Sequence, residues 1–101
     1  MTLELNAYKV TMLFPLLSNE GEPFAPEVWD WWLDKIMSMG YFHETTTRGV
    51  WRGLSEVHRC VVMVVAEGEL PILEAFLREA RDKFRQECMY LDAHPVFFKL
   101  V

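Results

Sequence analysis

Apolar side chains alternate with other residues near the start of the chain, which predicts a β-strand over residues 8–17. Val10, Met12 and Phe14 then share one face, because successive side chains of a strand point to opposite sides. Pro15 lacks a backbone N–H, so it ends the pairing or places the segment at a sheet edge. Residues 18–23 (Ser-Asn-Glu-Gly-Glu-Pro) have the composition of a loop.

The apolar spacing then changes to that of a helix, which we expect over residues 26–39. Pro26 suits the first helical turn, where its missing N–H costs nothing, and Gly40 suits the C-terminal stop. The apolar stripe predicted to be buried consists of Trp29, Trp32, Leu33 and Ile36.

Trp31 falls outside this stripe, among charged residues of the same helix. It could pack under the loop before the helix or against the C-terminal tail. Otherwise it contacts a partner or ligand, since Trp is enriched at interface hot spots. Trp31 is therefore a candidate interface residue.

Two further strands are predicted over residues 41–51 and 56–66. The first contains three consecutive β-branched threonines. Residues 48–55, which overlap the end of the first of these strands, contain Gly49 and Gly53 on either side of a tryptophan. This pattern indicates a hairpin connection or a glycine bulge.

Residues 60–66 are apolar at every position, unlike a strand with one solvated face. Helices can cover one side of this strand, but the remaining segments are too few to cover the other. A second subunit is the economical cover. The candidate interface residues on this strand are Cys60, Val62 and Val64.

A second helix is predicted to open at residues 68–71 and to end near Gln86 or Glu87. Its buried stripe is Leu73, Phe76, Leu77, Ala80 and Phe84. A fourth strand is expected over residues 88–91, interrupted at residues 92–95, with an extended segment over 96–101 that could add a fifth strand.

This order predicts an α+β fold, a ferredoxin-like βαββαβ sandwich in one domain over residues 1–101. Two helices would lie on one face of an antiparallel sheet, with room for an extra C-terminal strand. Folds of this shape often associate through the uncovered sheet face, so by analogy we expect a dimer or trimer of this chain.

Composition narrows the functional classes. Aromatic residues make up 14% of the 101 residues, which is rich for so small an interior and hints at an interface or apolar pocket. The net charge of −5 argues against nucleic acid and acidic membranes as partners. With no export signal or membrane span recognised, we expect a cytoplasmic protein with two buried thiols, Cys60 and Cys88.

Sequence motifs for chemistry are weak. His43, His58 and His94 lack metal-ligand spacing, so no metal is predicted. No glycine-rich loop connects a strand to a helix as phosphate binding requires, and no cofactor is predicted. Cys60 lies two residues after His58, but a packed thiol is favoured over a nucleophile.

The region around the predicted hairpin is the strongest candidate for ligand binding. Arg48 and Arg52 flank Trp51, and two guanidiniums beside an indole can hold a carboxylate and stack on a planar group. The alternative is ordinary cross-strand pairing of the two arginines with Glu44 or Glu56.

Glu87 follows the second predicted helix. If it were buried, its pKa would rise and it could act as an acid or base. The alternative is a salt bridge to an Arg or Lys.

The chain also resembles an uncharacterised family of short, mainly bacterial proteins known as a domain of unknown function. The shared features are a helix with Trp, a Gly-x-Trp-Arg segment, a Glu before an apolar strand, and Phe-x-Gln-Glu at the end of a helix. They correspond to residues 27–29, 49–52, Glu56 and 84–87, in matching order between residues 8 and 90. The resemblance implies the same fold and a site formed by Trp51, Arg52, Glu56, Gln86 and Glu87. It implies no activity.

Three functions compete at this stage. The favoured one is a non-catalytic, homo-oligomeric ligand-binding or regulatory module with a small molecule held near the hairpin at a subunit boundary. The second is a small enzyme in which Glu56 or Glu87 does acid–base work in a cavity between sheet and helices. The third is a structural interaction domain with Trp31 as its anchor.

Overall fold

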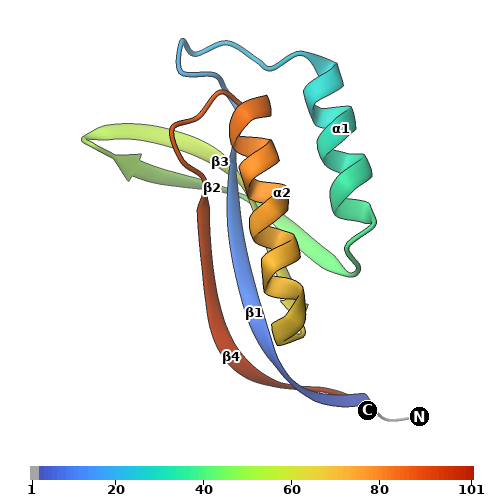
Figure 1. The fold of residues 1–101 in the computed structure, drawn as a ribbon. Helices are drawn as coiled ribbons and strands as arrows, with labels where there is room; N and C mark the ends of the chain where they lie inside the picture. The colour runs from blue at the N-terminus through green and yellow to red at the C-terminus, as the bar shows by residue number, and fades with distance from the viewer. Residues whose placement is uncertain (1–2) are drawn as a thin grey trace.

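The computed structural model describes residues 3–101, with side chains from residue 6 onward (Figure 1). The elements are β1 (Leu3–Pro15), α1 (Pro26–Met37), β2 (Phe42–Trp51), β3 (Leu54–Val65), a short 3-10 helix (Glu67–Glu69), α2 (Leu70–Lys83) and β4 (Tyr90–Leu100). The strands form one antiparallel sheet in the order β2-β3-β1-β4. The βαββαβ fold predicted from the sequence is confirmed.

The core lies between the sheet and the two helices. Val10, Met12 and Phe14 of β1 are fully buried, as their alternation predicted. Val61 and Met63 of β3 point the same way and join this core. The predicted stripe of α2 is also confirmed, since each of its five members is buried.

Helix α1 is rotated relative to the predicted stripe. Trp32 and Ile36 are fully buried, but Leu33 is 49% exposed, so its predicted burial is wrong. Trp31 stacks on Phe76 of α2 at 5.6 Å between ring centroids, and the Lys83 ammonium lies 5.6 Å from the Trp31 ring. Trp31 therefore lies between α1 and α2. It lies neither under the preceding loop nor against the C-terminal tail.

The apolar run of β3 divides between two environments. Val61, Met63 and Val65 are buried under the helices. The alternate residues lie on the face without helices, which we call the open face. There Val64 is 37% exposed, Val62 is half-buried, and Cys60 is only 9% exposed. Cys60 therefore offers little surface to a partner, and burial of the open face by a second subunit stays a prediction.

The connection between β2 and β3 is shorter than the sequence suggested. The strands pair up to Trp51 and Leu54, which leaves a two-residue turn of Arg52 and Gly53. Both have positive φ, 50° and 79° respectively, as a type I′ hairpin turn requires. The predicted hairpin connection is therefore confirmed, but it is shorter than residues 48–55, because Arg48 and Ser55 lie within strands.

The C-terminal region forms one strand. The predicted interruption at residues 92–95 and the fifth strand are wrong, because β4 pairs with β1 continuously from Tyr90 to Leu100. Pro95 is tolerated since β4 is an edge strand and needs no N–H on its outer side. Helix α2 ends at Lys83, earlier than expected, and Arg85 with φ 52° turns the chain toward β4.

Both cysteines are free, and only Cys60 is buried. The predicted burial of Cys88 is wrong, because the residue lies in the exposed connection before β4 rather than in a strand. Within residues 3–101, no helix is long and apolar enough to cross a membrane.

Candidate functional site

The tip of the β2–β3 hairpin presents its candidate residues on the open face. Gly49 pairs with Glu56 and Trp51 with Leu54, and directly opposite residues of a sheet point to the same side. Trp51 and Glu56 therefore share the face that carries Val62 and Val64. The Trp51 ring is accessible, with 52% of the residue exposed.

Arg52 connects this tip to the segment between α2 and β4. Its guanidinium carbon lies 5.4 Å from the Trp51 ring centroid, and its Nη1 atom lies 3.8 Å from Oε2 of Glu87. Both charged side chains are more than 70% exposed, so this ion pair adds little stability. The contact brings Trp51, Arg52 and Glu87 together although Glu87 is distant in sequence.

Glu56 contacts a residue of its own strand. Its Oε2 atom lies 3.1 Å from Nε2 of His58, two residues along on the same face. The Glu56 side chain is 41% exposed, whereas that of His58 is 14% exposed. Sequence reasoning did not select His58 as a site residue, although its i, i+2 spacing from Glu56 was a usable signal.

Two predicted site residues lie apart from this group. Arg48 points to the opposite face and donates from Nη1 to Oγ of Ser55 at 2.9 Å. Gln86 donates from Nε2 to Oδ1 of Asn19 at 3.3 Å and to the Phe84 carbonyl at 2.9 Å. Gln86 thus fixes the loop before α1.

The alternative cross-strand pairing of the arginines is not what forms. Arg48 donates to Ser55, and Arg52 pairs with Glu87 beside the Trp51 ring. Glu44 instead accepts from Nε of Arg59 at 3.1 Å. Face geometry explains this, because Thr46 is opposite Arg59, so Glu44 and Arg59 share the helix side of the sheet.

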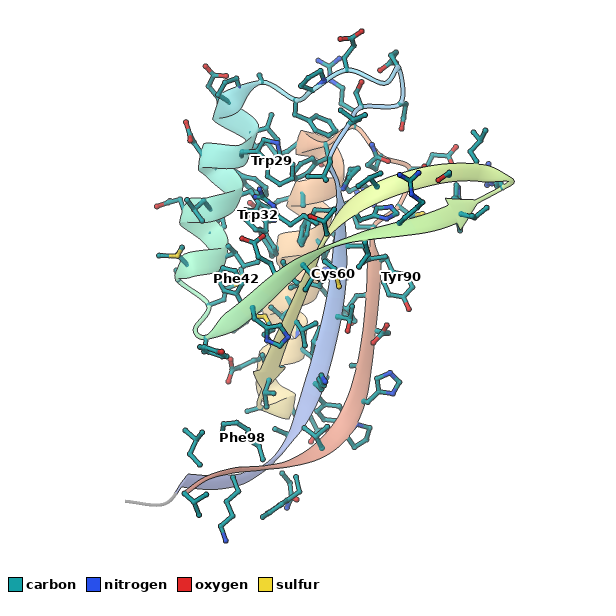
Figure 2. All side chains as sticks on the ribbon, turned by 180° about the vertical axis from the view of Figure 1, so that it is seen from behind. Trp29, Trp32, Phe42, Cys60, Tyr90 and Phe98 are labelled. Atoms are coloured by element: carbon teal, nitrogen blue, oxygen red, sulfur yellow. The ribbon has the colours of Figure 1, made fainter. Side chains whose placement is uncertain are left out.

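A second polar cluster lies on the open face of β4. The Tyr90 hydroxyl donates to Oδ2 of Asp92 at 2.6 Å, and Nε2 of His94 lies 3.4 Å from Oδ1 of the same carboxylate. The hydrogen bond and the negative charge of Asp92 raise the pKa of Tyr90 above its usual value near 10. Figure 2 shows Tyr90 and Cys60 at the same level of the sheet, in agreement with their shared partner Leu13.

Hollows in the described chain are open rather than enclosed. One, of ≈ 390 Å³, lies where β1 and β4 run on beyond β3, lined by residues such as Tyr8 and Phe97. Another, of ≈ 380 Å³, runs between α2 and β4 past Arg78 and Met89. Over residues 3–101, no group of three or more His, Cys, Asp or Glu side chains is arranged to hold a metal ion.

The hypothesis of an enzyme with an internal cavity is wrong. It required Glu56 and Glu87 to face a space between sheet and helices. Instead Glu56 lies on the open face and the Glu87 side chain is 79% exposed. Any chemistry by these carboxylates must occur at the surface of this chain or at a boundary between copies.

Comparison with known proteins identifies the fold but no family. No protein-family model matches the chain, and no curated protein matches it. Among solved structures, a phage SAM lyase in complex with S-methyl-5'-thioadenosine is similar, with a TM-score of 0.59 and 14% sequence identity. The match covers 93% of this chain and 88% of the lyase. The apo state of a phage SAM lyase is also similar, with a TM-score of 0.54, 13% identity and coverage of 94% and 89%.

At this identity the likeness shows a common fold and nothing more. The resemblance to a family of unknown function stays a prediction, since no family model supports it.

Proposed function

We propose that this protein is a homo-oligomeric small-molecule-binding module whose ligand is a nucleoside of the S-methyl-5'-thioadenosine class. The ligand lies at the hairpin tip, against Trp51, Glu56 and Glu87, where two copies meet. One observation carries this proposal: Trp51 and Glu56 occupy the same face as the half-buried Val62 and the exposed Val64. Copies that pack through the open face therefore place the hairpin tip at their boundary.

The side chains at the tip suit such a nucleoside chemically. An adenine ring can stack on the indole of Trp51, and stacking of a base on an aromatic side chain contributes about 1–3 kcal/mol. The carboxylates of Glu56 and Glu87 can accept hydrogen bonds from ribose hydroxyls. A sulfonium nucleoside such as SAM (S-adenosylmethionine) would also be favoured by these carboxylates and by the net charge of −5.

The fold comparison supports the choice of ligand class, because a protein of this fold is known in complex with S-methyl-5'-thioadenosine. The exposure of the tip supports a shared site. In a single copy, at least half of the surface of Trp51, Arg52 and Glu87 is exposed. Because ligand sites enclose most of their ligand, a second copy would complete the enclosure.

Isothermal titration calorimetry with S-methyl-5'-thioadenosine tests the proposal. We expect saturable binding by the wild-type protein and a loss of roughly 5–150-fold in affinity for Trp51→Ala, from the stacking range above. Trp51→Phe, which keeps a ring for stacking, should lose much less.

Val50→Ala is the matched control. Val50 is 74% exposed on the same hairpin but points to the opposite face, so its truncation should leave binding unchanged. Absence of binding by the wild-type protein to both S-methyl-5'-thioadenosine and SAM at millimolar concentration would contradict the proposal.

A second candidate function is cleavage of SAM at the same site. The pairing of Glu56 with His58 favours it, since such a pair at a ligand site can take up or release a proton. Chromatography of SAM incubated with the protein decides between the two functions. Release of S-methyl-5'-thioadenosine that is lost in Glu56→Gln would establish cleavage of SAM, and the co-product from the aminobutyryl chain would tell elimination from hydrolysis. Intact SAM would leave the binding module.

A further inference from the structure

We infer that His58 is the positioning residue that fixes Glu56 for the ligand, an inference that rests on the proposed function. The ring of His58 lies on the open face with Nε2 3.1 Å from Oε2 of Glu56. Its other nitrogen, Nδ1, is buried and has no hydrogen-bond partner in the described part of the chain. Glu56 is thus the polar contact that the structure gives the His58 imidazole.

The surroundings of His58 set the position of its proton. Across the sheet it faces Thr47 of β2 and Pro15 of β1, neither of which carries a charge. A carboxylate only accepts hydrogen bonds, so the ring proton must be on Nε2 to satisfy Glu56. A proton on Nδ1 of the neutral ring would leave a buried N–H without an acceptor, which is costly.

Gly49 of β2 lies next to the His58 ring. A Cβ atom added there would be 3.5 Å from Cε1 and 3.8 Å from Nδ1 of His58, so the backbone of Gly49 lies beside this edge of the ring. The imidazole is held between the strands while Glu56 stays 41% exposed. One carboxylate oxygen is engaged by His58, which leaves Oε1 to accept from a ribose hydroxyl of the nucleoside.

A double-mutant cycle tests this role with S-methyl-5'-thioadenosine as the probe. We expect His58→Leu and Glu56→Gln each to weaken binding by roughly 10–150-fold, the range for a hydrogen bond to a charged group. The double variant should be no weaker than Glu56→Gln alone, because the two residues act as one unit. His58→Gln, which keeps an amide donor near the position of Nε2, should recover part of the affinity.

Nitrogen-15 NMR of the imidazole provides a readout independent of ligand. The proton is expected on Nε2 in the wild-type protein, and an amide correlation spectrum of His58→Leu should show the fold intact. Three results would each overturn the positioning role. They are wild-type affinity in a folded His58→Leu variant, additive losses in the double-mutant cycle, and a proton on Nδ1. If Trp51→Ala still weakens binding in that case, the proposed function stands without it. If the wild-type protein binds neither nucleoside, the proposed function fails. The nitrogen atom of His58 that carries the proton, as observed by NMR, still decides whether the Glu56–His58 pair forms.

Discussion

Arg52 combines backbone strain with the contacts that build the candidate site. Its φ of 50° lies in the left-handed region, which costs a non-glycine residue roughly 1–2 kcal/mol. Asn adopts this conformation far more readily and is the preferred residue at the first position of a type I′ turn. Strain held at one position of the hairpin turn suggests that the guanidinium is kept for its contacts with Trp51 and Glu87.

Replacement of Arg52 should therefore separate stability from binding. We expect Arg52→Asn to leave the free energy of unfolding unchanged or to raise it by up to about 1 kcal/mol, since relief of strain offsets the loss of exposed contacts. Binding of S-methyl-5'-thioadenosine should weaken in calorimetry, because Trp51 and Glu87 lose their link. Arg52→Lys keeps the strain and the charge and is the control. Equal or tighter binding by Arg52→Asn would argue against a role for the guanidinium.

Tyr90 offers a test of the open-face network on β4. Asp92 stabilises the neutral phenol by accepting a hydrogen bond from its hydroxyl and repels the phenolate, which raises the pKa of Tyr90 above the value in the unfolded chain. The resulting contribution to stability is present below about pH 10 and is lost as pH rises through the folded-state pKa. In Asp92→Asn the pKa of Tyr90 should fall toward 10, as measured by phenolate absorbance against pH. An unchanged titration curve would mean that the hydrogen bond does not form in solution.

At the scale of elements, Arg59 joins α1 to the edge of the sheet. Its guanidinium carbon lies 4.5 Å from the ring centroid of Trp29 and 4.9 Å from that of Trp32, while Nε donates to Glu44. Figure 2 shows both indoles between α1 and the strands. A cation over an aromatic ring contributes about 0.5–2 kcal/mol, more when it is shielded from water, and the Arg59 side chain is only 34% exposed.

Removal of the Arg59 side chain should destabilise the fold. We expect Arg59→Ala to lower the free energy of unfolding by about 2 kcal/mol in urea denaturation, from the lost cation–π contacts and packing. Arg78→Ala is the control, because Arg78 pairs with Glu74 at 3.8 Å with both side chains more than half exposed. Its effect should stay within about 0.5 kcal/mol. Equal effects of the two substitutions would show that the indoles do not stabilise the Arg59 charge.

The sequence predicted elements better than it predicted their ends and contacts. Periodicity identified both helices and the buried faces of β1 and α2, because burial on one side dictates that spacing. The predicted β4 was interrupted at Pro95, because proline is tolerated within a strand only at a sheet edge. The strand order places β4 at the edge, and the sequence does not reveal that order. Periodicity also excluded Trp31 from the core, because the contact of Trp31 with Phe76 of α2 depends on how the helices pack.

The candidate site was only partly predictable for the same reason. Residue types around the hairpin identified Trp51, Arg52 and Glu56 as a group. The contact of Arg52 with Glu87 and the separation of Arg48 and Gln86 depend on which face and which end of the sheet each residue occupies. His58 was missed because its significance lies in a 3.1 Å contact and a buried Nδ1 atom, which composition does not reveal.

At the scale of the whole molecule, the sheet has one face covered by helices and one without them (Figure 1). Val62, Val64 and Leu13 lie in the middle of the open face, and the hairpin tip lies at one end of it. Full burial of a Val or Leu side chain contributes about 1.5–3 kcal/mol, so covering these partly exposed residues favours association. The ligand site and the assembly are therefore expected to depend on the same face.

A charge in the middle of the open face should prevent assembly without unfolding the chain. Val64 is 37% exposed and pairs with Lys9 of β1, so Val64→Glu can be accommodated in a single copy. A second copy would have to bury the new carboxylate, which is unfavourable without a partner. The control is Ile72→Glu, at a position on α2 that is 57% exposed and remote from the open face. It should leave the oligomer intact, and equal dissociation by both variants would mean that the open face is not the interface.

The most direct test of the account is the mass of the wild-type protein in solution. Size-exclusion chromatography with multi-angle light scattering, at micromolar concentration, should give two or three times the chain mass of 11.9 kDa. Val64→Glu should give the mass of one chain with an unchanged circular dichroism spectrum. A wild-type mass of 11.9 kDa would contradict the claim that the open face is covered by another copy.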